Sequence, residues 1–337
     1  MKAKISAIEY ALPSQVLTSE DLAREYPDWS VEKIEEKTGI SKRHIAGDKQ
    51  CASDLGVEAA KKLFAEGTCS PDSIDYLIFC TQSPDYFLPT TACVIQDRLG
   101  LPTSAGAIDF NQGCSGFIYG LGLAKGLIET GQARQVLLIA AETYSKFIHP
   151  GDKSVRTLFG DAGTATLITA VDSKKETVGP FVYGTDGRGA KNLIVHSGGL
   201  RLPKNVDTAK VEEDSHGNLR SKDNLYMNGP EIFTFTLLSV PRMVNALLKK
   251  CQINLDQVDL FVFHQANRFM LESLRKKLKI SEEKFVLAYE AFGNTVSSTI
   301  PIALREAQKR GQLKEGMRVM LVGFGVGYSW GATIIEW

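Results

Sequence analysis

The sequence predicts an α/β fold that is built from two similar halves. Three observations predict it: strand-like and helix-like stretches alternate along the chain, the strand-like stretches are almost continuously apolar, and parts of the first half recur in the second. Continuously apolar strands are typical of sheets that helices cover on both faces. With 337 residues, the chain is also longer than a single hydrophobic core usually supports.

Strands and helices can be assigned in order along the chain. Strands are short runs of β-branched and aromatic residues after a turn, and helices are longer stretches with apolar residues every three or four positions. In the first half this predicts strands at 74–81, 107–110, 136–140 and 165–169 and helices at 54–66, 91–99 and 115–130. In the second half it predicts helices at 230–250, 267–278 and 300–310 and strands at 260–264, 318–323 and 332–336.

Recurring segments indicate that the chain has two similar halves. This evidence requires no comparison with other proteins. Residues 71–80 resemble residues 255–264, each a turn followed by a short β-rich run, and residues 131–140 resemble residues 311–323 in the same way. The first match aligns a cysteine at the end of one strand with a histidine at the end of the other. Equivalent strand ends of the two halves therefore carry reactive side chains.

We divide the chain accordingly into a first half at 1–172 and a second half at 173–337. The segment 184–228 breaks the alternation of strands and helices, because it is rich in Gly, Asn, Asp, Lys and Ser. Loops of this length are usually functional or disordered. We expect this segment to form an excursion over one face of the second half.

Composition and charge exclude several classes of protein. Lys and Arg (39) balance Asp and Glu (39), so the basic excess of most nucleic-acid-binding proteins is missing. The N-terminal apolar stretch is too short for a signal peptide and no window is long enough for a membrane span, so we expect a cytoplasmic protein. The six cysteines form no C-x-x-C pair, so neither a disulfide framework nor a metal site is expected.

Three short motifs contain candidate catalytic residues. Cys114 lies in Gly-Cys-Ser-Gly before a predicted helix, where the N-terminal N–H groups and the helix dipole favour a thiolate. His264 begins His-Gln-Ala-Asn at the end of a predicted strand, the place where open sheets bind their ligands. Asn294 lies between a glycine and a threonine and aligns with Cys114 in the repeat. Taken singly, the three residues also suit a structural cysteine, a hydrogen-bonded core histidine and a turn asparagine.

Together these motifs resemble β-ketoacyl-acyl-carrier-protein synthase III, one of the thiolase-fold condensing enzymes. The resemblance spans nearly the whole chain and includes Thr38-Gly-Ile-Ser-Lys-Arg-His-Ile-Ala, Phe159-Gly-Asp-Ala-Gly, Gly323-Phe-Gly-Val-Gly and Trp330-Gly-Ala. It implies a thiolase-like fold with the layers α-β-α-β-α. It also implies a homodimer that has no tightly bound cofactor and uses acyl thioesters of coenzyme A or of an acyl carrier protein.

The resemblance also implies a reaction. Cys114 would accept the acyl group, and the backbone N–H groups of Cys114 and Val326 would form the oxyanion hole. His264 and Asn294 would hold the enolate that forms when a malonyl thioester loses carbon dioxide. The expected reaction is therefore a decarboxylative Claisen condensation that gives a β-ketoacyl thioester. Two alternatives are an acyltransferase that passes the acyl group to an amine or hydroxyl, and a structural partner subunit of another synthase.

Further residues are assigned through the same resemblance. The acyl and pantetheine pocket would be lined by Phe87, Phe159, Phe233, Asn267 and Phe324, with Phe87 reaching the pocket of the partner subunit. An acidic carrier protein would dock on a basic helix face formed by Arg268, Arg275, Lys276 and Lys277. Lysines on a helix face are, however, often plain solvated residues.

The sequence departs from the family in the region that binds the nucleotide of coenzyme A. Lys33 and Lys37 stand where the family has the Trp and Arg that sandwich the adenine, and Lys153 and Pro230 replace an Arg and an Asn. Trp29 lies one helical turn earlier and could substitute only with a different local backbone. These changes favour a carrier protein as the acyl donor, although the lysines preserve the charge. The acyl chain and the pathway cannot be read from the sequence.

Overall fold

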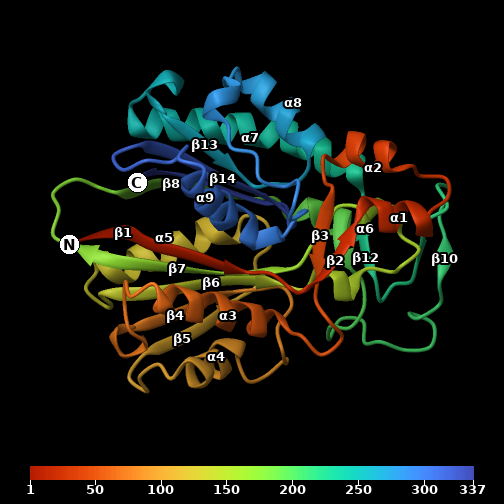
Figure 1. The fold of residues 1–337 in the computed structure, drawn as a ribbon, viewed down its shortest axis with the longest axis horizontal. Coiled ribbons are helices and arrows are strands. Elements are labelled where there is room, and N and C mark those ends of the chain that lie inside the picture. Colours follow the sequence, from red (N-terminus) through yellow and green to blue (C-terminus); the bar gives the residue numbers. More distant parts are fainter.

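The computed structural model describes all 337 residues and contains two packed β-sheets (Figure 1). The first sheet has the strand order β1-β7-β6-β4-β5. Within it β4 is parallel to β5 and β6, whereas β7 is antiparallel to β6 and β1. The strands of this sheet are β1 (Lys2–Ala11), β4 (Tyr76–Cys80), β5 (Gly106–Phe110), β6 (Gln135–Glu142) and β7 (Ala162–Val171).

The second sheet has the strand order β13-β14-β15-β8. Here β13 is parallel to β14, and β15 is antiparallel to both of its neighbours. A parallel bridge between Phe261 and Phe285 adds one more short member at the β13 edge. The strands of this sheet are β8 (Val178–Thr185), β13 (Leu260–Phe263), β14 (Arg318–Gly325) and β15 (Ser329–Glu336).

Helices form three layers around the two sheets. The outer face of the first sheet is covered by α3 and α4, and that of the second by α7 and α8, while α5 and α9 lie between the sheets and contact both (Figure 1). This arrangement is the α-β-α-β-α layering that the sequence predicts. The helices are α3 (Ala52–Ala65), α4 (Thr91–Leu99), α5 (Gly116–Glu129), α7 (Gly229–Cys251), α8 (Arg268–Leu278) and α9 (Thr299–Lys309).

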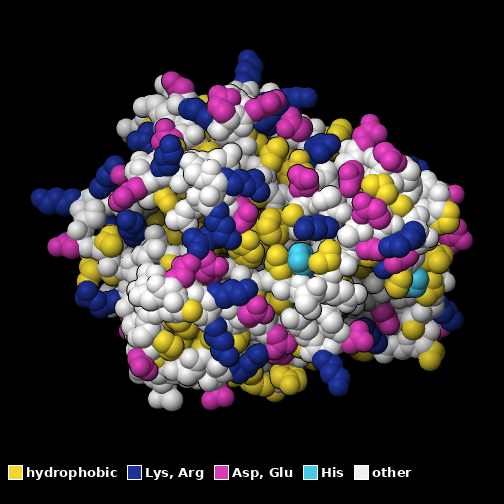
Figure 2. All heavy atoms as spheres, in the orientation of Figure 1, with side chains coloured by type: hydrophobic (Ala, Val, Ile, Leu, Met, Phe, Trp, Pro, Cys, Tyr) yellow, Lys and Arg dark blue, Asp and Glu magenta, His cyan; other side chains and the backbone are white.

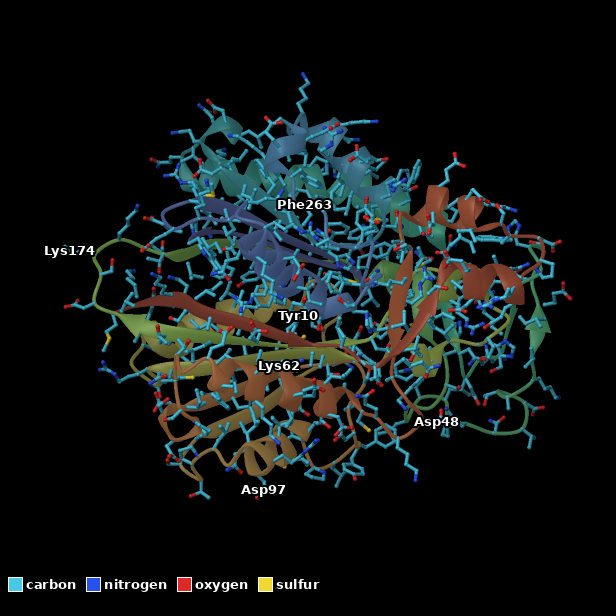
Figure 3. All side chains as sticks on the ribbon, in the orientation of Figure 1. Tyr10, Asp48, Lys62, Asp97, Lys174 and Phe263 are labelled. Atoms are coloured by element: carbon cyan, nitrogen blue, oxygen red, sulfur yellow. The ribbon has the colours of Figure 1, made fainter.

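The middle layer contains a core to which both halves contribute. Phe117 of α5 and Ile300 and Leu304 of α9 are fully buried among apolar strand residues of both sheets. Each such side chain stabilises the fold by about 1.5–3 kcal/mol relative to an exposed one. Tyr10, which is labelled in Figure 3, lies near the end of β1. Its hydroxyl donates a 2.8 Å hydrogen bond to Glu306 of α9. The middle layer therefore holds the two halves together.

The two halves have the same order of elements. In the first, β1, α3, β4, α4, β5, α5, β6 and β7 follow one another, and in the second, β8, α7, β13, α8, the Phe285 segment, α9, β14 and β15 do so. The duplication is confirmed, and the residues after β5 correspond to those before α9. The link between Val171 and Val178 contains the boundary that we propose between residues 172 and 173.

All predicted strands and helices are present, with ends shifted by a few residues, but several elements were missed. β1 alternates buried and less buried residues, and its register shifts between Ile5 and Ala7, so its period of two is interrupted. β8 contains Gly179-Pro180 and is mostly half-buried, which hides its strand character. Two short helices and the antiparallel strand pair that flanks them were also missed: α1 (Ser19–Glu25), α2 (Val31–Thr38), β2 (Gln15–Thr18) and β3 (Lys42–Ile45).

The segment after β8 contains two short antiparallel strand pairs, one inserted within the other. β9 (Leu193–Val195) pairs with β12 (Leu225–Met227), and β10 (Glu212–Glu213) pairs with β11 (Leu219–Arg220). The Arg220 guanidinium bonds to Asp152 of the first half at 2.6 Å, beside the short helix α6 (Lys153–Arg156). The sequence predicts an excursion over one face of the second half. The segment 184–228 in fact packs against the first half as well.

α7 is the one helix that is long and apolar enough to cross a membrane by length and composition. Its apolar residues Val240, Val244 and Leu247 are fully buried against the second sheet, and it carries Arg242 and other charged residues. A helix of this kind is the core helix of a soluble protein.

Candidate active site

The three candidate catalytic residues lie together at the ends of equivalent strands. Cys114 lies in the turn between β5 and α5, His264 directly follows β13, which ends at Phe263 (Figure 3), and Asn294 precedes α9. Their side chains line one pocket of about 450 Å³. Each residue is at most 7% exposed. The pocket therefore combines a thiol, an imidazole and a carboxamide, contributed by both halves.

The Cys114 turn is closely packed against the end of β14. A Cβ atom on Gly325 would lie 2.8 Å from Cys114 Cβ and 2.9 Å from its Sγ, so only glycine allows this approach. The backbone N–H groups of Cys114 and Val326 both bond to the sulfur and lower its pKa. These are the two N–H groups that the sequence predicts for the oxyanion hole.

The resting sulfur of Cys114 is a thiol. Burial, together with the nearby charge of Glu142, raises its pKa to about 12 despite the two N–H groups. The expectation that the N-terminus of α5 favours a thiolate is therefore wrong for the resting protein, because desolvation outweighs it. The two N–H groups become important when negative charge develops on the substrate or the sulfur.

The His264 side chain is neutral and held by one neighbour. Burial lowers its pKa to about 3. Its Nδ1 lies 2.7 Å from Thr299 Oγ1, and that hydroxyl lies 2.9 Å from the Val296 carbonyl. The Val296 carbonyl also accepts the backbone N–H of Thr299, and its oxygen has two lone pairs. The Thr299 hydroxyl has one proton, which it can donate to that carbonyl or to Nδ1, and donation to Nδ1 keeps the proton of the imidazole on Nε2.

The Asn294 carboxamide is oriented by its own turn. Gly293 adopts a positive φ of 70°, which allows the chain to turn here, and Asn294 Oδ1 accepts the Val296 N–H at 2.9 Å. The Nδ2 amino group remains as the donor that can face a substrate. The backbone of Asn294 bonds to Leu158 and Gly160 of the first half, which fixes the loop across the junction.

The pocket walls are mainly apolar. Of the predicted lining residues, Phe159, Phe233, Asn267 and Phe324 do line the pocket, as do several residues that sequence reasoning missed: Leu158, Leu193, Met227, Ile232, Phe269 and Met270. No acidic residue lines it. Phe269 is 62% exposed and stacks on Phe233 with ring centroids 5.0 Å apart, so an aromatic pair forms part of the pocket wall near the surface.

Known proteins resemble this chain over its full length. The family model described as 3-oxoacyl-[acyl-carrier-protein] synthase III matches residues 108–187, and the model of its C-terminal part matches residues 248–337. A β-ketoacyl-[acyl-carrier-protein] synthase III from Caldanaerobacter subterraneus is 37% identical over 97% of this chain and 95% of its own. One from Halalkalibacterium halodurans is 36% identical over 100% of this chain and 97% of its own.

The chain belongs to the β-ketoacyl-acyl-carrier-protein synthase III family.

Solved structures of this synthase III family agree. A crystal structure of a 3-oxoacyl-(acyl-carrier-protein) synthase III, at 55% identity, has a TM-score of 0.99 and covers 100% of both chains. The Burkholderia xenovorans 3-oxoacyl-(acyl-carrier-protein) synthase, at 38% identity, has a TM-score of 0.91 over 100% of this chain and 94% of its own. The predicted family, thiolase-like fold and condensing function are confirmed, over the acyltransferase and the structural-subunit alternatives.

The predicted docking residues differ in how exposed they are. Arg268, Lys276 and Lys277 are exposed on α8. Arg275 is only 9% exposed, and its guanidinium bonds to Glu272 at 2.8 Å and to Glu282 at 2.7 Å. Arg275 therefore cannot form part of an open docking face. Basic and acidic side chains alternate over the face shown in Figure 2 rather than forming one large patch.

Phe87, another predicted pocket residue, does not reach the pocket of its own chain. It is 83% exposed and lies between Tyr86 and Leu88, which are also largely exposed. Three adjacent exposed apolar side chains are unusual on a monomer surface and typical of an interface. Its predicted insertion into a partner subunit stays a prediction.

The residues that differ from the family's nucleotide-binding residues lie around Trp29, in α6 and at the start of α7. Trp29 precedes α2, and the ammonium groups of Lys33 and Lys37 lie 5.2 and 4.8 Å from the centroid of its ring. The ring thus binds two cations and offers little open surface to an adenine. Lys153 lies in α6, and Pro230 lines the pocket at the start of α7.

Proposed function

We propose that this synthase III joins an acyl group on Cys114 to a malonyl-type thioester on an acyl carrier protein. The observation that carries the proposal is the pocket itself: a buried thiol, a neutral imidazole and an amide donor in an apolar site without a lining carboxylate. A carboxylate beside the nucleophile would repel an enolate and suit proton abstraction instead. The neutral donors suit charge that develops on an oxygen.

The first half-reaction transfers the acyl group. The Cys114 sulfur forms a bond to the thioester carbonyl carbon, and the bond from that carbon to the donor sulfur breaks. The thiol proton of Cys114 passes to the departing thiolate, so no external base is consumed. The N–H groups of Cys114 and Val326 hold the tetrahedral oxyanion.

The second half-reaction forms the new carbon–carbon bond. The malonyl carboxylate leaves as carbon dioxide, and the electron pair moves into an enolate whose oxygen is held by His264 Nε2 and Asn294 Nδ2. The enolate carbon attacks the acyl carbonyl, and the Cys114 sulfur leaves as a thiolate that takes up a proton from water to restore the resting thiol. The product is a β-ketoacyl thioester on the carrier.

Two measurements together test this proposal. Intact-mass spectrometry after incubation with a panel of acyl thioesters should show an adduct on Cys114, and malonyl-carrier protein should then release carbon dioxide with the β-ketoacyl product. An adduct that passes to an amine or hydroxyl without carbon dioxide release would support the acyltransferase instead. We also propose a cytoplasmic homodimer, in which the exposed loop around Phe87 lies at the interface.

The Thr299 hydroxyl is expected to set the imidazole tautomer. In Thr299→Val the shape is kept but Nδ1 loses its donor, so the proton can move from Nε2 to Nδ1. Carbon dioxide release should fall by about tenfold or more, less than removal of an oxyanion donor costs. Thr299→Ser keeps the hydroxyl and should retain most activity. Equal rates in Thr299→Val and the parent enzyme would refute this role, provided that acylation of Cys114 is measured separately.

The lysines beside Trp29 are expected to make coenzyme A a poor acyl donor. A base stacked on an aromatic side chain is stabilised by about 1–3 kcal/mol in nucleic-acid complexes, and this surface is missing here. The parent enzyme should load Cys114 with a higher kcat/KM from an acyl-carrier protein than from the matching acyl-coenzyme A. Lys33→Trp with Lys37→Arg should raise coenzyme A use about tenfold, for about 1.4 kcal/mol, and leave carrier-protein loading unchanged. Equal efficiency of both donors in the parent enzyme would end this proposal.

A further inference from the structure

A fully buried carboxyl group lies behind the nucleophile and has no role in the steps above. Glu142 ends β6 and is 0% exposed. The Gln82 N–H donates to its two oxygens at 3.0 and 3.1 Å, the Ser83 hydroxyl at 2.8 Å and the Ser297 hydroxyl at 3.3 Å. No basic side chain pairs with it. Burial of a carboxyl that no cation balances lowers the free energy of unfolding. We therefore expect that this group serves a function.

One side of this carboxyl supports the Cys114 turn. Gln82 follows β4, and its side-chain amide donates to Asn111 Oδ1 at 2.9 Å. Asn111 begins the turn that carries Cys114. The Gln82 side-chain oxygen accepts the Tyr144 hydroxyl, which fixes the amide from its other end. Glu142 thus holds the backbone of Gln82, and the side chain of Gln82 supports the Cys114 turn.

The other side of the carboxyl supports the loop with the enolate donor. Ser297 belongs to the short 3₁₀ turn Val296–Ser298, and Val296 is the residue whose N–H orients the Asn294 carboxamide. The next residue, Ser298, donates to the Ala140 carbonyl of β6 at 2.8 Å. The last residues of β6 therefore hold the second half's catalytic loop against the first half.

We propose that Glu142 is a positioning residue for both half-reactions, because its carboxyl fixes the Cys114 turn relative to the loop that carries Asn294. This proposal rests on the proposed function, which assigns the catalytic roles of Cys114 and Asn294. It adds Glu142, which does not line the pocket and touches no substrate.

The charge of Glu142 adds a second, measurable effect. Burial raises its pKa to about 8, against the hydrogen bonds from Ser83, Gln82 and Ser297, which lower it. Around neutral pH the group is therefore mostly the uncharged acid, and above about pH 8 it becomes an anion. That anion raises the pKa of Cys114, so ionisation of Glu142 opposes formation of the thiolate. The other titratable groups that face this cluster are Cys80, Tyr144 and Asp161.

The test is the pH dependence of Cys114 alkylation by iodoacetamide, in the full-length protein without substrate. In the parent enzyme the logarithm of the rate should rise less steeply above about pH 8, where Glu142 ionises. In Glu142→Gln, which keeps the shape but not the charge, the rise should continue, with alkylation about tenfold faster at pH 9–10 for a pKa one unit lower. An unchanged bend in Glu142→Gln would overturn the electrostatic link.

A matched control is Asp161→Asn. Asp161 is also fully buried and also accepts backbone N–H groups, from Ala46 at 2.7 Å and Ser145 at 3.0 Å, but it makes no contact with the Cys114 turn. The bend should persist in this variant but move to a lower pH, because the Asp161 charge raises the pKa of Glu142. If it disappears, a general change in buried charge explains the effect and the assignment to Glu142 is wrong.

The positioning role is tested by single hydroxyl deletions. Ser297→Ala removes the carboxyl's contact to the Asn294 side, so it should lower carbon dioxide release severalfold and affect acylation of Cys114 much less. Ser83→Ala removes a contact on the Cys114 side and should slow acylation more than release. Equal small losses in both half-reactions for both variants would refute the positioning role. Alkylation needs no substrate, so it remains informative even if the proposed condensation is not observed.

Discussion

Cys114→Ala is expected to form no acyl-enzyme with any acyl thioester. The change removes the only thiol that lines the pocket, and no other nucleophile of comparable strength lines it. The fold should survive, because a single atom is lost from a turn of small residues. Intact-mass spectrometry measures the adduct, and thermal unfolding checks the fold.

Cys80→Ala provides the matched control for this variant. Cys80 is also fully buried and lies beside the Cys114 turn, where its thiol donates to the Gln112 carbonyl at 3.2 Å. It does not line the pocket, so the Cys80 variant should still be acylated. An adduct of the same mass on the Cys114→Ala protein, mapped to another residue, would show that the nucleophile has been misassigned.

His264→Ala and Asn294→Ala should separate the two half-reactions. Both variants should accept an acyl group on Cys114, since neither side chain holds the first oxyanion. Carbon dioxide release from the malonyl thioester should fall about a hundredfold or more in each, which is the usual loss for one oxyanion donor. Because burial lowers the pKa of His264 to about 3, its titration should not shape the pH profile near neutrality.

His196, one of the two exposed histidines of the excursion, gives the control for this experiment. His196→Ala should release carbon dioxide at the parental rate, because the side chain lies outside the pocket. Parental release in His264→Ala and Asn294→Ala as well would instead favour transfer of the acyl group without decarboxylation.

The candidate catalytic residues could be placed because Cys114 and His264 follow short apolar runs whose order is the same in both halves, and Asn294 aligns with Cys114 in the repeat. Their expected roles come from the resemblance to the synthase III family. The state of the Cys114 sulfur could not be predicted. The helix N-terminus is visible in the sequence, whereas the burial that outweighs it depends on packing against β14.

Other features escaped because they depend on side-chain direction or on distant segments. Arg275 is adjacent to Lys276 in the sequence, but neighbouring residues on a helix point in different directions, and Arg275 turns towards Glu282. The hydrogen-bond partners of Glu142 are Gln82, Ser83 and Ser297, which lie far from it in the chain. No local pattern marks a residue whose partners all lie elsewhere.

The duplicated architecture has a consequence for how this chemistry arose. Cys114 and Asn294 occupy corresponding places in two equivalent halves, each at the start of a middle-layer helix. An ancestor assembled from two identical copies would have presented two thiols or two amides to the shared pocket, never one of each. A decarboxylating condensation needs a nucleophile on one side and a neutral donor on the other. Duplication of the ancestral half therefore had to precede this division of labour, because only two separately encoded copies can diverge at the two positions.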